Sequence, residues 1–137
     1  MLNLATFREK EDGAAAVEAA LLLPVVIVLI MGTLEASLTF YTFTEMHHRT
    51  RDFVRRVAVG SLTPAQAEAE LGSSLPRWVS RHASVEVSET DPTDPEGNVI
   101  TASISVPIRN ASPFPFFSDR VDAEMTAANS MKQEKAP

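Results

Sequence analysis

The stretch Ala19–Leu34 carries no charged residue, and it constrains the fold of this 137-residue chain more than any other feature. A helix needs about 20 predominantly apolar residues to cross a bilayer. Extending the stretch back to Ala14 supplies that length, provided that one carboxylate, Glu18, is tolerated. We therefore predict a transmembrane helix over 14–41, with aromatic side chains near its end, where an interfacial belt would lie: Phe40, Tyr41 and Phe43.

A secretory signal peptide is the alternative interpretation of this apolar stretch. Signal peptides have an apolar region of about 7–15 residues, preceded by a basic segment and followed by a small-residue cleavage site. The stretch here is longer, and the segment before it, Arg8–Asp12, holds more acidic than basic residues. Both features favour a helix that is retained in the membrane.

Composition limits the classes of function. The formal net charge of −6 gives no indication of nucleic-acid binding, and the absence of cysteine excludes disulfides and thiol catalysis. His47 and His48 are adjacent, so on a helix they point about 100° apart and do not share a metal as histidines four residues apart do. The sequence contains no spacing of a nucleophile with a base and no phosphate-binding glycine loop. We expect neither an enzyme nor a cofactor or metal site.

The residues before the apolar stretch form a second pattern, in which Gly13 is followed five positions later by Glu18. This pattern resembles the cleavage and assembly signal of type IV pilin-like prepilins. The longer segment GAAAVEAALLLPVVIVLIMGTLEAS is similar to TadE-like proteins of the tight-adherence (Tad/Flp) type IVb pilus systems. The resemblance implies a prepilin-like leader over 1–13, which a prepilin peptidase removes by cutting between Gly13 and Ala14.

The same resemblance implies a role for Glu18 in subunit assembly, as the fifth residue of the processed chain. In pilin-like assemblies this glutamate pairs with the terminal amine of a neighbouring subunit, here that of Ala14. The pairing is physically reasonable, because two charges in a low-dielectric medium are stabilised only when they are well paired. The alternative is that Glu18 extends to the headgroup region without a partner. Gly13 also has a purely structural alternative, as a residue at a helix start.

Glu35 is the second candidate for subunit assembly. TadE-like proteins often carry a glycine, two apolar residues and a glutamate near the end of this helix, and Gly32–Glu35 matches that pattern here. The resemblance implies that Glu35 pairs with a basic residue of a partner pilin. The alternative is a carboxylate at the end of the helix that reaches water.

Charge and resemblance predict opposite orientations in the membrane. Lys and Arg near a span favour the cytoplasmic side, and fewer stand before the span than after it: Arg8 and Lys10 against Arg49, Arg51, Arg55 and Arg56. The resemblance implies a cytoplasmic N-terminus and a periplasmic C-terminal domain at the bacterial inner membrane, because prepilin peptidases cut on the cytoplasmic side. Long C-terminal domains are translocated largely regardless of their charge, so we expect this second orientation.

Residues 42–60 are predicted to continue the helix as an amphipathic stem. Apolar residues recur there at helical spacing: Phe43, Met46, Phe53, Val54 and Val57. We expect this stripe to pack on the globular part of the chain and Gly60 to end the helix. The arginines on the other side are interpreted as a solvated face, with anionic lipid headgroups or acidic partner subunits as alternative contacts.

Residues 61–131 are predicted to form a small α+β domain that begins with a short helix. Thr63 has the position of an N-cap, followed by proline and, at the third helical position, Gln66. This helix is expected to end at Gly72. Residues 76–79 are expected to form a short apolar connection in which Trp78 anchors the core.

Alternation of apolar and polar residues predicts the strands of this domain. It covers 84–88 and 99–108, which are joined by a turn-rich loop over 91–98 whose prolines and spacing argue against a calcium site. Residues 120–128 alternate as well, although their Ala, Met and Glu favour helix; we predict a third strand there. The Pro113–Phe117 segment is expected to cover the sheet or to meet another subunit.

The sequence thus predicts an α+β, type IV pilin-like fold with a long transmembrane helix, an amphipathic stem, a short helix, a small antiparallel sheet and a disordered tail over 132–137. From the resemblance we expect a non-enzymatic minor pseudopilin that takes part in assembly of a Tad/Flp adherence pilus. Its expected partners are a prepilin peptidase, other Tad pilins and pseudopilins, and inner-membrane lipids. The alternative is an unprocessed, membrane-anchored periplasmic scaffold or binding module.

Overall fold

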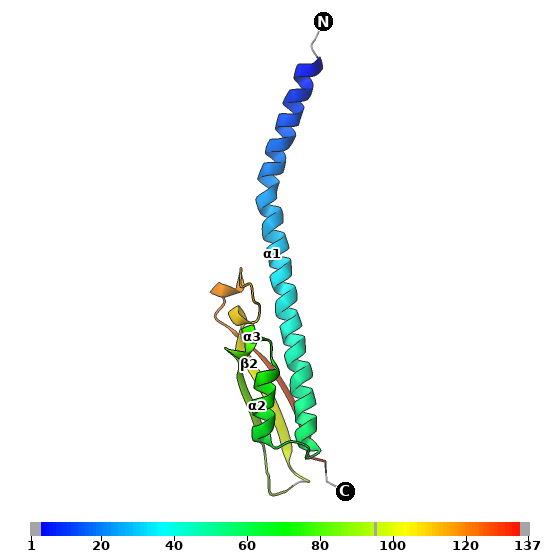
Figure 1. Cartoon of the computed structure of the whole chain (residues 1–137), viewed down its shortest axis with the longest axis vertical. Coiled ribbons are helices and arrows are strands. Elements are labelled where there is room, and N and C mark those ends of the chain that lie inside the picture. Colours follow the sequence, from blue (N-terminus) through cyan, green and yellow to red (C-terminus); the bar gives the residue numbers. More distant parts are fainter. Residues whose placement is uncertain (1–3, 95, 135–137) are drawn as a thin grey trace. The chain divides into compact units, whose positions relative to one another are not determined.

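A helix of 55 residues, α1 (Leu4–Ala58), forms the N-terminal part of the computed structural model (Figure 1). The structure describes residues 4–94 and 96–134, with side chains from residue 13 on. Contacts divide the chain into two units, one from Met1 to Leu34 and one from Glu35 to Pro137. The predicted membrane helix and the predicted stem are both parts of α1. Because the division falls inside this helix, α1 contributes residues to both units.

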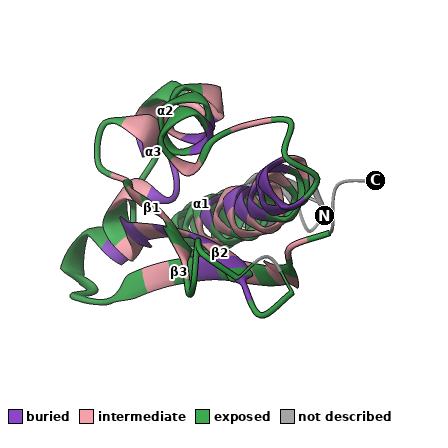
Figure 2. Cartoon of the chain, turned by 90° about the horizontal axis from the view of Figure 1, so that it is seen from below, coloured by how far each residue is buried: buried purple, intermediate pink, exposed green. Residues whose placement is uncertain are grey.

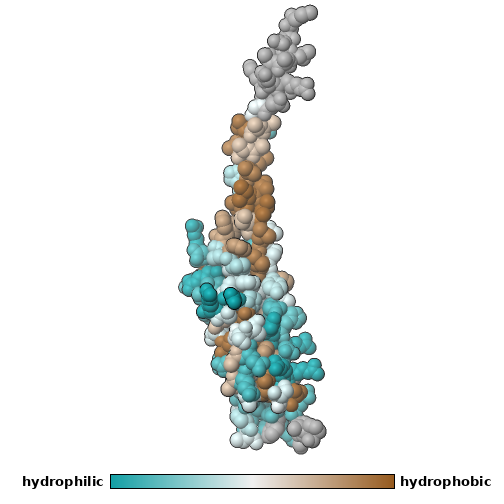
Figure 3. All heavy atoms as spheres, viewed as in Figure 1, coloured by the Kyte–Doolittle hydropathy of each residue, from teal (hydrophilic) through white to brown (hydrophobic). Residues whose placement is uncertain are grey.

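The first unit consists of a single helical segment. Its large apolar side chains are exposed between Val17 and Leu34, and Figure 3 shows hydrophobic side chains gathered along this part of α1. Pro24 lies inside the helix, which membrane helices tolerate. Among the residues that the structure describes, the helical segment Gly13–Ala58 is long and apolar enough to contain a membrane span.

Helix α1 ends in a Schellman motif at Gly60, which confirms the predicted helix end. Gly60 has a φ of +73°, a left-handed conformation that glycine adopts without a steric penalty. Its backbone N–H donates to the carbonyl of Val57, and the N–H of Ser61 donates to the carbonyl of Arg56, both over 2.9 Å. These bonds satisfy two carbonyl groups that the helix end would otherwise leave without donors.

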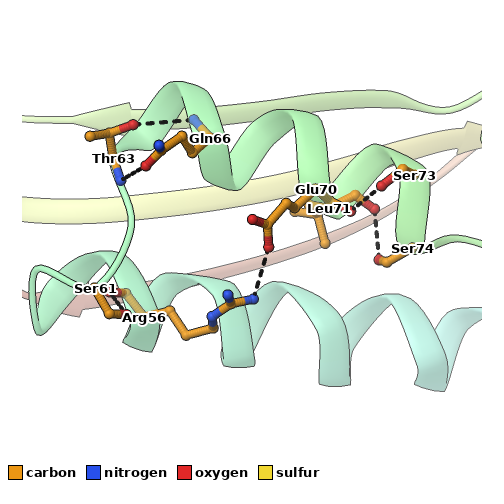
Figure 4. Close-up of polar contacts among 8 residues, drawn as sticks. All are labelled: Arg56, Ser61, Thr63, Gln66, Glu70, Leu71, Ser73 and Ser74. Carbon is orange, nitrogen blue, oxygen red and sulfur yellow. Dashed lines mark hydrogen bonds and ion pairs between the residues drawn. The ribbon is translucent and has the colours of Figure 1, made fainter.

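Helix α2 (Pro64–Ser74) begins where the sequence predicts. Thr63 and Gln66 form a capping box, in which the Gln66 N–H donates to Thr63 Oγ1 over 3.3 Å and the Thr63 N–H donates to Gln66 Oε1 over 3.1 Å (Figure 4). An ion pair of 3.2 Å between Arg56 Nη1 and Glu70 Oε2 connects α2 to the last turns of α1. The burial of Ala67 and Leu71 in the core holds α2 in place, and the exposed ion pair adds at most about 1 kcal/mol.

The prediction that Gly72 ends this helix is wrong, because Gly72 lies inside α2. The helix ends at Ser74, since Pro76 disfavours a helical conformation for the residue before it, and Leu75 is extended with a ψ of 152°. The next turn forms a short helix, α3 (Arg77–Ser80), where the sequence predicted a short apolar connection.

Two glycine substitutions test this assignment of helix ends. A Cβ on Gly72 would meet only Val85 Cγ2, at 3.9 Å, which is an ordinary contact. We expect Gly72→Ala to raise the free energy of unfolding by about 0.5–1 kcal/mol, because alanine is the better helix former. Gly60→Ala is expected to lower it by about 1–2 kcal/mol, because alanine is strained at positive φ. Denaturant unfolding of the full chain in detergent micelles, followed by Trp78 fluorescence, measures both. A destabilising Gly72→Ala would contradict the assignment.

Three antiparallel strands in the order β1-β2-β3 form the sheet of the second unit. They are β1 (Ser84–Glu89), β2 (Val99–Pro107) and β3 (Glu124–Lys132). Ile108 does not extend β2 as predicted, because it follows Pro107 and begins the 3-10 turn η1 (Ile108–Asn110). The third strand confirms the choice of strand over helix for 120–128, although its bounds lie further along the chain.

The register gives the sheet one apolar and one polar face. Ile104 in the central strand pairs with Val85 on one side and with Ala127 on the other, so apolar residues of all three strands share a face. The opposite face carries two cross-strand pairs of hydroxyl groups, Thr101 with Ser130 and Ser105 with Thr126. Figure 2 shows α1 and α2 on the same side of the sheet.

The core lies between the apolar face and these helices (Figure 2). The stem contributes four of the five residues of its predicted stripe, which confirms that the stripe packs on the globular part: Met46, Phe53, Val54 and Val57. Phe43, the fifth, is half-buried. Trp78 packs against the core but is itself only partly buried.

Polar contacts add to this packing at the end of the chain. Asn129 Nδ2 donates to Thr50 Oγ1 over 2.6 Å, which joins β3 to α1. Lys132 is the last residue of β3, and the N–H of Glu134 donates to the carbonyl of Ala58 over 3.0 Å. The predicted disordered tail over 132–137 therefore does not include 132–134, and 135–137 lie outside the described residues.

Candidate functional site: the carboxylates of helix α1

The predicted cleavage position lies inside α1. Gly13 and Ala14 are helical and exposed, and a Cβ on Gly13 would meet nothing within 4 Å. Glycine in a helix interior costs about 1 kcal/mol relative to alanine, so it weakens the helix at this point. A peptidase that takes an extended backbone would have to unwind α1 locally, and Gly13 makes that unwinding easier.

Glu18 is exposed among exposed apolar neighbours, which include Val17, Leu21 and Leu22. It forms no ion pair with any residue whose side chain the structure describes. A charged side chain in a membrane helix costs up to about 3 kcal/mol by insertion scales, and the cost is largest at the centre of the helix. A cation supplied by another molecule would reduce this cost, and the exposed position leaves the carboxylate accessible to such a partner.

Glu35 is the first residue of the second unit, and only 5 % of its surface is exposed. Its Oε2 accepts hydrogen bonds from the backbone N–H groups of Phe116, over 3.0 Å, and Phe117, over 2.7 Å. Its Oε1 accepts from the N–H of Ser118 over 2.8 Å. Three successive N–H groups that converge in this way form an anion-binding nest. Glu35 therefore ties this loop to α1 within the same chain.

The sequence did not indicate these contacts. The interpretation of Glu35 as a carboxylate that reaches water is wrong, because the side chain is buried. Pairing with a partner pilin stays a prediction. The three donors lie 81 to 83 residues further along the chain, and no local pattern links two segments at that separation. The sequence gives one indication that Glu35 has a special role, which is its position directly after the apolar stretch.

The loop held by Glu35 exposes three phenylalanine side chains. Phe114, Phe116 and Phe117 are 70, 61 and 50 % exposed, and the loop continues into the short turn η2 (Ser118–Arg120). Such exposure does not fit the first predicted role of this segment, which was to cover the sheet. The second predicted role, contact with another subunit, stays a prediction.

A groove of about 440 Å³ lies beside this loop, and Pro113 and Pro115 form part of its lining. Three arginines also line it, none of which forms an ion pair with a described residue: Arg77, Arg81 and Arg109. Trp78 contributes to the lining, and its buried Nε1 has no hydrogen-bond partner in the described part of the chain. The groove is therefore positively charged.

Asp91, an acidic residue in the loop between β1 and β2, is engaged locally. Asp91 Oδ1 accepts hydrogen bonds from the Thr93 hydroxyl, over 2.6 Å, and from the Thr93 N–H, over 3.0 Å. The hydroxyl and then this N–H lower the pKa of Asp91, against a smaller effect of burial. Over 13–94 and 96–134, where the structure describes side chains, no three histidine, aspartate or glutamate residues are grouped to hold a metal ion.

Comparison with known proteins found one family model that matches the segment of α1 with these carboxylates. Residues 13–55 match the model of the TadE-like protein family, and this segment begins at Gly13 and contains both Glu18 and Glu35. No curated protein and no solved structure matches the chain. TadE-like proteins are pilus components, so the match associates the chain with Tad pilus systems. From Gly13 to Arg55, then, the chain is similar to TadE-like proteins.

Proposed function

We propose that the chain is a minor pseudopilin that takes part in the assembly of a Tad/Flp adherence pilus and has no enzymatic activity of its own. The observation that carries this proposal is the exposed carboxylate of Glu18, which has no ion-pair partner among the described side chains. It lies five residues after Gly13, inside the family-matched segment. A carboxylate in an apolar helix is a functional-site hypothesis by default.

In the proposed mechanism, the first unit anchors the chain in the bacterial inner membrane with its N-terminus in the cytoplasm. A prepilin peptidase cuts the locally unwound helix between Gly13 and Ala14 and releases the leader 1–13. The carboxylate of Glu18 then pairs with the new α-amino group of Ala14 in a neighbouring subunit. Each charge compensates the other for the loss of water, and the small side chains of 14–16 allow close helix packing.

For Glu35 the contacts support a role within the chain. Its two carboxylate oxygens already accept three backbone N–H groups, and the side chain is buried, which leaves little access for a basic partner residue. We therefore propose that Glu35 contributes to assembly indirectly, by fixing the shape of the loop that follows η1. Direct pairing of Glu35 with a partner pilin would require this nest to open.

The second candidate function is an unprocessed, membrane-anchored periplasmic scaffold or binding module. One observation favours it: Glu11 and Asp12 directly precede Gly13, whereas leaders of pilin-like proteins usually carry basic residues near the cut. This candidate shares the membrane anchor with the first and differs in leaving residues 1–13 on the chain.

Deletion of the gene from the source bacterium tests the proposed role in pilus assembly. We expect the deletion strain to lose surface pili, and a plasmid copy of the full chain to restore them. Electron microscopy of cells and immunoblots of sheared pilus fractions measure the outcome. Normal numbers of pili on the deletion strain would contradict the proposal.

A further inference from the structure

We propose that the aromatic loop (Pro113–Phe117) and the arginine groove (Arg77, Arg81 and Arg109) dock on the lipid headgroup layer of the membrane that α1 enters. The inference rests on the proposed membrane anchoring and goes beyond it, because it gives the second unit its own lipid-binding surface. The proposed binding partner of this surface is the headgroup layer, together with the parts of the acyl chains next to it.

Chain connectivity places the loop at the edge of the membrane. Glu35 directly follows Leu34, the last residue of the uncharged stretch, in the same helix. Its carboxylate lies 2.7 to 3.0 Å from the backbone nitrogens of Phe116, Phe117 and Ser118. When Ala19–Leu34 occupies the hydrocarbon core, the loop is therefore within one glutamate side chain of the end of that stretch.

The exposed side chains at this level have the chemistry of a membrane interface. Phe114, Phe116 and Phe117 are exposed on the loop, and Phe40 and Tyr41 are exposed on α1 a few residues beyond Glu35. Clustered exposed apolar side chains mark interaction surfaces, and aromatic side chains gather where headgroups meet the hydrocarbon core. The two prolines between and beside the phenylalanines limit the freedom of the loop.

Charge complementarity points to phospholipid rather than to another apolar surface. The arginine groove shares Pro113 and Pro115 with the loop, so the cationic and aromatic surfaces are continuous. Its arginines have no ion-pair partner among the described residues. The planar guanidinium group binds phosphate through two parallel hydrogen bonds, and basic pockets beside membrane helices attract anionic headgroups.

Single-cysteine labelling tests the proposal cleanly, because the chain contains no cysteine. The full chain would carry a nitroxide label at Leu29→Cys in the apolar stretch, at Phe116→Cys in the loop, or at Val59→Cys, which is exposed beyond the last turn of α1. Each labelled protein is reconstituted in vesicles of phosphatidylcholine and phosphatidylglycerol. Collision of the label with oxygen reports lipid, and collision with a water-soluble nickel chelate reports water.

We expect the labels at positions 29 and 116 to favour oxygen, with the label at 116 nearer the headgroups, and the label at 59 to favour nickel. A label at 116 that favours nickel while the label at 29 favours oxygen would overturn the docking and leave the anchoring intact. A label at 29 that favours nickel would instead overturn the anchoring. Spin–spin broadening at 116 that increases with protein density, without preference for oxygen, would assign the loop to a second copy of the chain and overturn the lipid proposal.

A second comparison tests the arginine groove. In vesicles of phosphatidylcholine alone, we expect the label at Phe116→Cys to lie less deep than in vesicles that contain phosphatidylglycerol. The triple variant Arg77→Gln, Arg81→Gln, Arg109→Gln is expected to remove that difference while the circular dichroism spectrum is unchanged. If the three arginines are present and the label at position 116 lies equally deep in both lipid mixtures, the proposed role of the arginine groove in docking is overturned.

Discussion

Glu35→Ala is expected to lower the free energy of unfolding of the second unit by about 2–4 kcal/mol. The substitution removes the acceptor of three backbone N–H groups, on Phe116, Phe117 and Ser118. Hydrogen bonds to a charged group contribute about 1.5–3 kcal/mol each. Water can reach part of this exposed loop and replace some of them, so the expected loss is smaller than the sum of three.

Denaturant unfolding of the full chain in detergent micelles measures this effect, with the fluorescence of the single tryptophan, Trp78, as a reporter within the second unit. Glu68→Ala is the matched control, because Glu68 is exposed on α2 and forms no ion pair with a described residue; surface changes of this kind are usually within about 0.5 kcal/mol. The free energy of unfolding of the Glu35→Gln protein is expected to lie between those of the two alanine variants, because glutamine keeps one acceptor oxygen. Equal stabilities of the Glu35→Ala and Glu68→Ala proteins would contradict the role of Glu35.

Glu18→Ala is expected to abolish pilus assembly while leaving cleavage after Gly13 unchanged. In the proposed assembly the Glu18 carboxylate is buried against the amino group of Ala14 in a neighbouring subunit. Removing one member of a buried ion pair costs about 3–5 kcal/mol, which corresponds to about a hundredfold or greater loss of affinity between subunits. The alanine variant also sits more favourably in the bilayer, which further disfavours its extraction into a fibre.

Counts of surface pili on the deletion strain, complemented with each variant, measure this effect. Glu86→Ala is the control, because Glu86 lies on β1, is exposed and has no ion-pair partner among the described residues. Glu18→Asp keeps the charge and is expected to restore some of the pili. Full piliation with Glu18→Ala would rule out the pairing, although it would leave processing and anchoring untouched.

The elements of the fold that the sequence predicts are those whose burial follows a local period. The stripe from Met46 to Val57 recurs at helical spacing, and the alternation over 84–88 and 99–108 marks one face of each strand. The apolar residues of these patterns pack in the core, except Ile108, which lies beyond β2. The capping box at Thr63 is equally local, since both of its hydrogen bonds join residues three apart. The end of α2 was mispredicted because Gly72 and Pro76 compete within one turn, and proline has the stronger effect.

The candidate site could be predicted only in part, because its two carboxylates depend on different information. Glu18 stands out from the sequence alone, as the one charged residue between Gly13 and Leu34. The contacts of Glu35 depend on where tertiary packing brings residues 116–118. The same holds for the bond from the Thr42 hydroxyl to the carbonyl of Ala111, which joins α1 to the start of the same loop. Contacts between segments about 70–80 residues apart leave no periodic signal in either segment.

The N-terminal mass of the protein, purified from cells with and without the prepilin peptidase, tests the proposed processing most directly. We expect the chain to begin at Ala14 when the peptidase is present and to retain residues 1–13 when it is absent. A chain that retains Met1–Gly13 in both samples would contradict processing, and with it the pseudopilin role, in favour of the unprocessed scaffold.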